Sequence, residues 1–72
     1  MPNFIVNSNK YQGHHEVHDI SRTCNNPHYP LPQNRVSLGW FSTCHGAVAA
    51  ANAMGYKPAD GCYWCARACH TR

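Results

Sequence analysis

The segment Cys62-Tyr63-Trp64-Cys65 is the part of the sequence whose residue types and spacing are best suited to chemistry. Two cysteines separated by two residues can hold one metal ion from a tight turn, and this half-site recurs in structural zinc domains. Gly61, just before the pair, suits such a turn. A complete tetrahedral site needs two further ligands, so the pattern predicts that another part of the chain supplies them.

His18 and Cys24 are the expected second pair of ligands. A histidine near the end of a strand and a cysteine in the following loop can present two ligands at one place. Together with Cys62 and Cys65 they would form a closed site of three cysteines and one histidine, which leaves no open position for a substrate. Zinc, the expected cofactor, would then link the two ends of the chain and contribute about 10 kcal/mol or more to folding.

The order of these features resembles the small Ada-type metal-binding domains. After His18 and Cys24, residues 34–36 open a strand, an alanine-rich stretch ends near residues 55–58, and residues 61–65 close the series. The resemblance implies a single zinc ion shared between a ligand pair after a hairpin and a C-x-x-C pair after a helix. Nearly the whole chain is also similar to a group of short uncharacterised bacterial proteins, a likeness that implies no function. The shared residues are Glu16-Val17-His18, Cys24, Cys44, Cys62, Cys65 and Cys69-His70-Thr71.

Cys44, Cys69 and His70 are additional to the Ada-type pattern and are further candidate ligands. Cys69 follows the C-x-x-C pair by about one helical turn, so on a helix it would share a face with that pair. It could therefore replace Cys24 as a ligand or pair with Cys44. In another interpretation, Cys44 and Cys69 are buried free thiols that act as small hydrophobic residues.

The remaining histidines and the aromatic residues are assigned mainly to the surface. His14 and His15 are expected to be exposed in a loop, as is His45 in the first turn of a helix, while His28 stands among prolines without an obvious partner. Trp40 is expected in the core. The aromatic residues expected to be partly on the surface are Tyr11, Tyr29, Tyr63 and Trp64.

The elements that must position the ligands begin with two or three short strands. Residues 3–6 and 15–20 are expected to form a β-hairpin. Residues 35–41 alternate between apolar and other side chains, which predicts a third strand, and Gly39 indicates either a bulge within it or a close approach of another backbone. Residues 25–34 contain three prolines and are expected to form a loop.

One main helix is expected from Ser42 or Thr43 to Met54, because this stretch is alanine-rich and contains no proline. The stripe expected to face the core consists of Cys44, Val48, Ala51 and Met54. Residues 57–61 are expected to form a turn, and residues 62–70 a cysteine knuckle that runs into a short helix.

The fold class predicted is α+β, in one domain over residues 1–72. It consists of a small antiparallel sheet of two to three strands, one main helix and the C-terminal knuckle with its short helix, all stabilised by zinc. Below roughly 70–80 residues, a hydrophobic core alone rarely gives more than ~3–5 kcal/mol. Much of the apolar content of this chain is alanine, which buries little area. A metal site would supply the missing stability.

Composition favours a protein of the cytoplasm. The first ten residues contain an apolar run of only three, and no stretch approaches the ~20 apolar residues of a membrane span. In a reducing compartment, clustered cysteines indicate metal or redox chemistry more often than structural disulfides, and five is an odd number for a disulfide framework. The net charge of +3 comes from scattered basic residues, which permits contact with nucleic acid without requiring it.

The function expected is that of a binding module whose partner is nucleic acid or another protein, rather than an enzyme. Glu16, Asp19 and Asp60 are the only acidic residues, too few to suggest paired-carboxylate catalysis. Two alternatives remain open at this point. One is a small protein stapled by disulfides, and the other is a thiol redox or metal-trafficking protein with a labile metal or an accessible, acidic cysteine.

Overall fold

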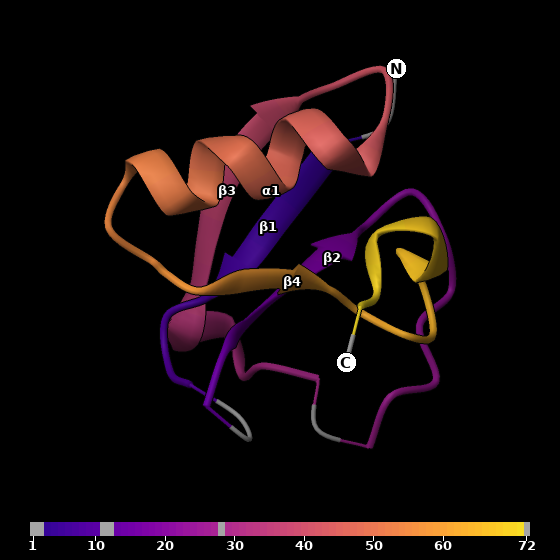
Figure 1. The fold of residues 1–72 in the computed structure, drawn as a ribbon. Helices are drawn as coiled ribbons and strands as arrows, with labels where there is room; N and C mark the ends of the chain where they lie inside the picture. The colour runs from indigo at the N-terminus through magenta and orange to yellow at the C-terminus, as the bar shows by residue number, and fades with distance from the viewer. Residues whose placement is uncertain (1–2, 11–12, 28, 72) are drawn as a thin grey trace.

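The computed structural model of the chain describes residues 3–10, 13–27 and 29–71. These residues form a mixed four-stranded sheet in the order β3-β1-β2-β4, with one α-helix against it (Figure 1). The strands are β1 (Asn3–Asn7), β2 (His15–Asp19), β3 (Arg35–Trp40) and β4 (Ala59–Gly61). The helix is α1 (Cys44–Ala53), and two short 3-10 helices are η1 (Pro32–Asn34) and η2 (Arg67–Cys69).

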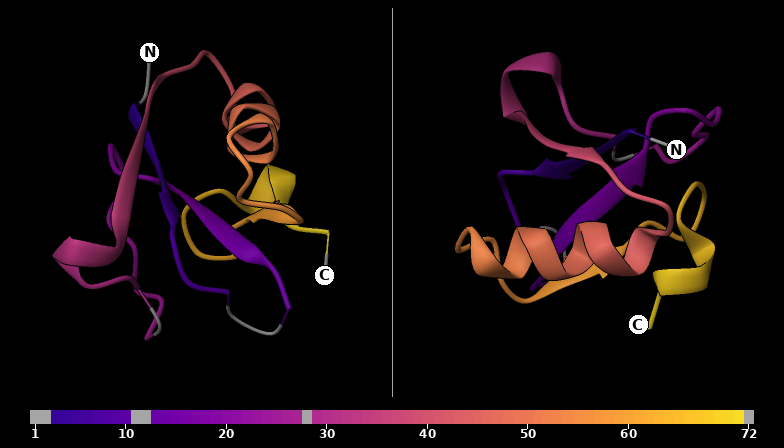
Figure 2. Two further views of the ribbon diagram at one scale, coloured as in Figure 1. Left: turned by 90° about the vertical axis from the view of Figure 1, so that its left-hand side faces the viewer. Right: turned by 90° about the horizontal axis from the view of Figure 1, so that it is seen from above.

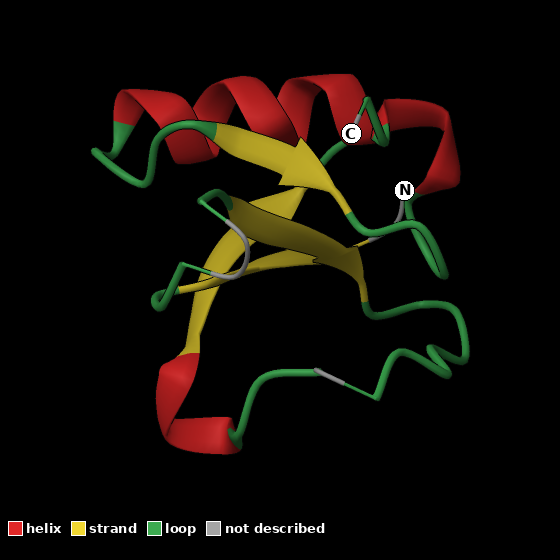
Figure 3. Ribbon diagram, turned by 60° about the horizontal axis from the view of Figure 1, so that its bottom comes forward, coloured by secondary structure: helices red, strands yellow, loops and turns green. Residues whose placement is uncertain are grey.

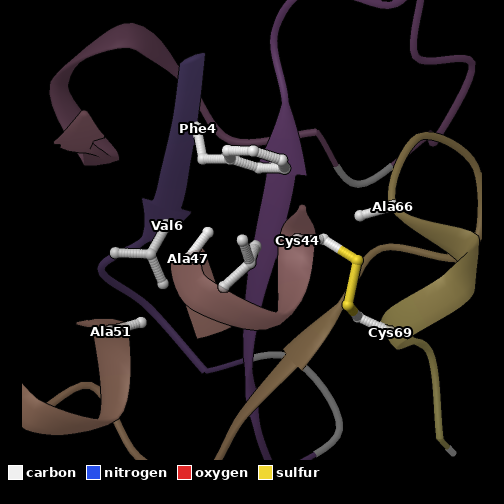
Figure 4. Close-up of a cluster of buried hydrophobic side chains, with 8 residues drawn as sticks. Phe4, Val6, Cys44, Ala47, Ala51, Ala66 and Cys69 are labelled. Atoms are coloured by element: carbon white, nitrogen blue, oxygen red, sulfur yellow. A yellow bond between two sulfur atoms is a disulfide. The ribbon is translucent and has the colours of Figure 1, made fainter. Parts of the chain in front are cut away.

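The core lies between the sheet and α1 (Figure 2). Strand β1 pairs antiparallel with both β2 and β3, so it is buried in the middle of the sheet. Val6 pairs with Val17 across the β1–β2 ladder, and both side chains are fully buried. Ala47 and Ala51 of α1 pack against this surface, and their small side chains allow the helix to lie close to the sheet (Figure 4).

The predicted main helix is confirmed, with small differences in its bounds and its buried face. Thr43 occupies the N-cap position, and Gly55, with a φ of 97°, follows the end of the helix. The expected core stripe is wrong at Met54, which is 53% exposed, because the helix turns its Cys44, Ala47 and Ala51 face toward the sheet.

Strand β4 corrects two predictions. Residues 57–61 do not form only a turn, and the sheet is not purely antiparallel, since β4 pairs with β2 in a parallel arrangement. The polypeptide crosses from one edge of the sheet to the other through α1, which allows this parallel pairing. The side-chain oxygen Oδ1 of Asn52 accepts a hydrogen bond of 3.0 Å from the backbone N–H of Ala59 and so fastens β4 to α1.

Trp40 is 64% exposed, so its predicted place in the core is wrong. The β1–β3 ladder shifts register between Phe4 and Ile5, opposite Ser37 and Gly39. This irregularity confirms the bulge expected at Gly39, whose φ is 95°. A bulge changes which face the following residues occupy, so Trp40 no longer continues the alternation of Val36 and Leu38.

Two further features complete the fold. The segment that joins β2 to β3 is mostly loop and ends in η1 (Figure 3). Among the helices that the described residues form, none combines the length and apolar character needed to span a membrane.

Candidate metal centre

His18, Cys24, Cys62 and Cys65, the four ligands predicted from the sequence, lie together. Each offers one ligand atom, and these atoms all lie within 4.8 Å of one another. The group is thus positioned to hold a metal ion, with two ligands from the N-terminal half of the chain and two from the C-terminal end.

The parallel pairing of β2 and β4 explains why distant parts of the chain meet here. In this ladder Val17 is the partner of Gly61, so the next residues along the two strands are His18 and Cys62. The backbone N–H of Cys62 donates a hydrogen bond of 2.9 Å to the carbonyl of Val17 and continues the ladder by one step. The turn that follows brings Cys65 back toward His18, and the loop after β2 brings Cys24.

Three distances between the ligand atoms agree with the edges of a tetrahedral site. The sulfurs of Cys24 and Cys62 are 3.7 Å apart. The Nδ1 atom of His18 lies 3.5 Å from the Cys65 sulfur and 3.9 Å from the Cys24 sulfur. With zinc–sulfur bonds of about 2.3 Å and a zinc–nitrogen bond of about 2.0 Å, a tetrahedron has sulfur–sulfur edges of about 3.8 Å and sulfur–nitrogen edges of about 3.5 Å. These three edges have the lengths that a bound ion would require, and all four ligand atoms lie within 4.8 Å of one another.

The cluster is buried on most sides. His18 and Cys62 have no exposed surface and Cys65 is 2% exposed, whereas Cys24 is half-buried. The other ring nitrogen of His18, Nε2, is also buried and has no hydrogen-bond partner in the part of the chain that the structure describes. Nδ1 is thus the ring atom that faces the sulfurs.

The three thiols of the cluster differ in the direction in which their pKa is shifted. A hydrogen bond from Cys65, together with weaker contributions from His18, from the Asn26 side chain and from the Trp64 backbone, lowers the pKa of Cys62 well below its usual range. The hydrogen bond to Cys62, followed by burial, raises the pKa of Cys65. Burial is the main cause that raises the pKa of Cys24. Cys62 is consequently the first of the three to become a thiolate, the form that binds metal.

Asn26 and Glu16 support this thiolate, and no motif in the sequence indicates either role. The Nδ2 group of Asn26 donates hydrogen bonds to the Cys62 sulfur at 3.4 Å and to Oε1 of Glu16 at 3.1 Å. The backbone N–H of Trp64 donates a second bond of 3.4 Å to the same sulfur. Such outer partners orient metal ligands and tune their affinity.

Cys44 and Cys69 form a disulfide, which was one of the alternatives for this pair (Figure 4). In this oxidised state neither sulfur is a free thiol or an available ligand, and Cys69 does not replace Cys24 in the main cluster. The third additional candidate, His70, lies outside that cluster as well. Its Nδ1 atom is 3.1 Å from the carbonyl oxygen of Gly61 and 3.6 Å from Oδ2 of Asp60, so it braces β4.

His14 and His15 are buried, with 3% and 8% of their surface exposed, so the expectation that they lie in an exposed loop is wrong. They belong to or adjoin β2, an inner strand of the sheet, where side chains on both faces are covered. His15 contacts the carbonyl oxygen of Asn7 at 2.9 Å through Nδ1. His45 is exposed as predicted, whereas His28 and Tyr11 lie outside the described residues.

Aromatic side chains lie on the surface beside the cluster. Tyr63 and Trp64, within the C-x-x-C turn, are 44% and 52% exposed. The guanidinium carbon of Arg67 lies 4.8 Å from the centre of the Tyr63 ring. Tyr29 is half-buried, and its ring centre is 4.8 Å from that of His18. The knuckle thus presents two aromatic rings and a cation next to the candidate metal ligands.

Comparison of the chain with protein-family models, with curated proteins and with solved structures gives no match.

Proposed function

We propose that this chain is a zinc-stabilised binding module. The observation that carries the proposal is the cluster of His18, Cys24, Cys62 and Cys65 at distances suited to one tetrahedral ion. Three soft thiolate ligands and one imidazole favour zinc over magnesium or calcium, which prefer oxygen ligands. The Ada-type arrangement of the ligands in the sequence agrees with the same ion.

The proposed role of the metal is structural. Four protein ligands fill a tetrahedral zinc site and leave no position for a water molecule or a substrate. The module is accordingly proposed to bind rather than to catalyse, and a cytoplasmic location is part of the proposal because thiolates stay available for metal in a reducing compartment.

The surface proposed to contact the partner is formed by Tyr63, Trp64 and Arg67. Exposed aromatic rings can stack on unpaired bases, and a nearby arginine can contact the phosphates, which is a common way to bind single-stranded nucleic acid. The net charge of +3 is compatible with such a partner, and the exposed rings and the arginine are what support it. A protein partner is the alternative, since exposed tryptophan and tyrosine also anchor protein interfaces.

Intact mass under native and then denaturing, non-reducing conditions tests the metal. For the chain with the Cys44–Cys69 bond formed, the expected native mass exceeds the chain by one zinc ion, and the denatured chain should contain one disulfide and three free thiols. A chain without metal and with two disulfides would contradict the proposal and favour the disulfide-stapled alternative, which the Cys44–Cys69 bond already supports in part. Zinc that leaves rapidly would instead favour metal trafficking, with half-buried Cys24 as the ligand that exchanges.

Substitution of single cysteines separates the metal from the disulfide. Cys62→Ser or Cys65→Ser should abolish zinc binding and unfold the domain, whereas Cys44→Ala should retain zinc and lower stability less. The readouts are metal content and circular dichroism. Equal and mild effects of the three substitutions would be incompatible with a metal-centred fold.

The partner is tested with a single-stranded oligonucleotide titrated against tryptophan fluorescence. Trp64→Phe should remove most of the quenching, whereas Trp40→Phe, at an exposed position on β3, should leave it unchanged. Absence of quenching and of any shift in mobility with the oligonucleotide would exclude nucleic acid and leave a protein partner.

A further inference from the structure

A second group of ligand-type side chains lies at the N-terminus of α1, apart from the four residues of the main cluster. Cys44, His45 and Cys69 each offer one ligand atom, and these atoms lie within 4.8 Å of one another. The disulfide joins two of the three. If that bond is reduced, the two sulfurs can move apart from their bonded positions, and two thiols and one imidazole are then close enough to bind one ion.

We propose that reduction of the Cys44–Cys69 disulfide creates a second metal site, in which Cys44, His45 and Cys69 bind a thiophilic divalent ion such as zinc. This inference does not rest on the proposed binding function, because the two groups share no residue. It also gives His45, an exposed residue that contributes nothing to the core, a defined role.

The positions of the three residues support the proposal. Cys44 and His45 are the first two residues of α1, and Cys69 is the last residue of η2, so all three are fixed by regular backbone. Cys44 and Cys69 are buried, which protects thiolate–metal bonds from water, whereas the exposed His45 gives an ion a route of entry. Two thiolates and an imidazole form a ligand set typical of zinc.

An open coordination position distinguishes this site from the main cluster. Three protein ligands leave the fourth position of a tetrahedral ion to water or to a small ligand. Cys44 and His45 line a cavity of about 300 Å³, which also contacts Arg22, Ser42 and Arg67. The cavity is large enough for water and a small molecule beside the ion, so the second ion is expected to exchange more readily than the first.

The chemistry balances with a small thiol as the reductant. Two molecules of thiol transfer two electrons and two protons to the disulfide, which gives the Cys44 and Cys69 thiols and one molecule of the oxidised small disulfide. Zinc then replaces the two thiol protons and releases them to solvent. In reverse, the small disulfide oxidises the two cysteines, takes up two protons to become two thiols, and the ion is released. The disulfide and the second ion therefore exclude each other.

Cobalt(II), which reports tetrahedral thiolate ligation through its visible absorption, is the probe for the test. The oxidised chain should bind one equivalent of cobalt. A second sample is reduced with a phosphine, and the phosphine is then removed in the absence of air. This reduced chain should bind two equivalents of cobalt. His45→Ala should bind one equivalent in both states, and the matched control Ser42→Ala, in the same cavity wall, should behave as the parent chain. Circular dichroism of each reduced sample verifies that it is folded.

The second equivalent of cobalt bound after reduction tests the second site separately from the proposed function. Cys24→Ala is expected to weaken or remove the first equivalent and to leave the gain of one equivalent on reduction. If reduction of a folded chain adds no equivalent, or if His45→Ala retains the added equivalent, the second site is excluded. If the parent chain binds no cobalt when oxidised but one equivalent when reduced, only the main zinc cluster is overturned.

Discussion

Among the glycines, Gly61 is the one at which an added methyl group should disturb the candidate metal centre most, although it is not itself a ligand. A Cβ atom at Gly61 would lie 2.5 Å from the carbonyl oxygen of Ala66, 2.6 Å from Cβ of Cys69 and 2.8 Å from its carbonyl carbon. None of these neighbours is the tip of a flexible side chain, and Cys69 is also tethered to Cys44 by the disulfide. Gly61→Ala must therefore displace either β4 or the knuckle.

The cost can be estimated from overpacking in other cores, which destabilises by about 1–3 kcal/mol and occasionally by more. Three simultaneous close contacts with backbone and Cβ atoms place Gly61→Ala at the upper end, near 3 kcal/mol. For a domain of this size, that loss lowers the melting temperature by roughly 12–24 °C. A shift of β4 would also move Cys62, the residue after Gly61, and so lower zinc affinity.

Gly55→Ala is the matched control, measured by thermal unfolding and by zinc competition with a chelating dye. Gly55 has a φ of 97° and no atom within 4 Å of an added Cβ, so alanine there is strained but unobstructed. The expected cost is about 1–2 kcal/mol, with zinc affinity unchanged. If Gly61→Ala binds zinc as tightly as the parent chain and is no less stable than Gly55→Ala, the position assigned to the knuckle against β4 is refuted.

Three further predictions concern the cluster and the surface beside it. Asn26→Ala removes a donor to the Cys62 sulfur and is expected to weaken zinc binding about 10- to 100-fold, measured by competition with a chelator. Zinc binding at pH 8 is expected to release about two thiol protons rather than three, measured by calorimetry in buffers of different ionisation enthalpy. The reason is that hydrogen bonds, first from Cys65, lower the pKa of Cys62, so it has already lost its proton, whereas the pKa values of Cys24 and Cys65 are raised. Zinc affinity consequently rises as the pH rises, by about two logarithmic units per pH unit near pH 8. Trp64→Ala should change the unfolding free energy by less than about 0.5 kcal/mol, since the side chain is 52% exposed, while it removes binding to the partner.

Each of these predictions has an outcome that contradicts it. Unchanged zinc affinity in Asn26→Ala would mean that its bond to Cys62 has no influence on the metal. Release of three protons would indicate that the metal-free cluster holds no thiolate. A large loss of stability in Trp64→Ala would show that the ring is part of the core, and the surface proposed for the partner would have to be abandoned.

The candidate ligands could be found from the sequence because their chemistry is local. The C-x-x-C spacing alone identifies Cys62 and Cys65 as a ligand pair. His18 and Cys24 are recognised by their residue types and by their positions near the end of one strand. The main helix could also be predicted, since its alanine-rich run lies between Thr43, a residue type common at the N-cap position, and Gly55.

What could not be predicted depends on contacts between distant segments. Strand β4 is only three residues long, and Ala59-Asp60-Gly61 has no apolar alternation, so its parallel pairing with β2 is visible only in three dimensions. The burial of His14 and His15 follows from that same pairing, which makes β2 an inner strand. Asn26 was missed because its role requires the loop after β2 to fold back against Cys62.

The disulfide has a consequence for how quickly the proposed metal centre would assemble. Cys44 and Cys69 are 25 residues apart, and the chain they enclose contains both Cys62 and Cys65. Closing a loop of this length removes unfolded-state entropy that corresponds to about 3.5 kcal/mol in the chain-entropy account. In the oxidised chain the C-x-x-C pair is therefore partly preorganised before any ion arrives. Zinc binding then has to order fewer residues. After zinc is removed with a chelator and added back, the oxidised chain should therefore bind it again faster than the reduced chain.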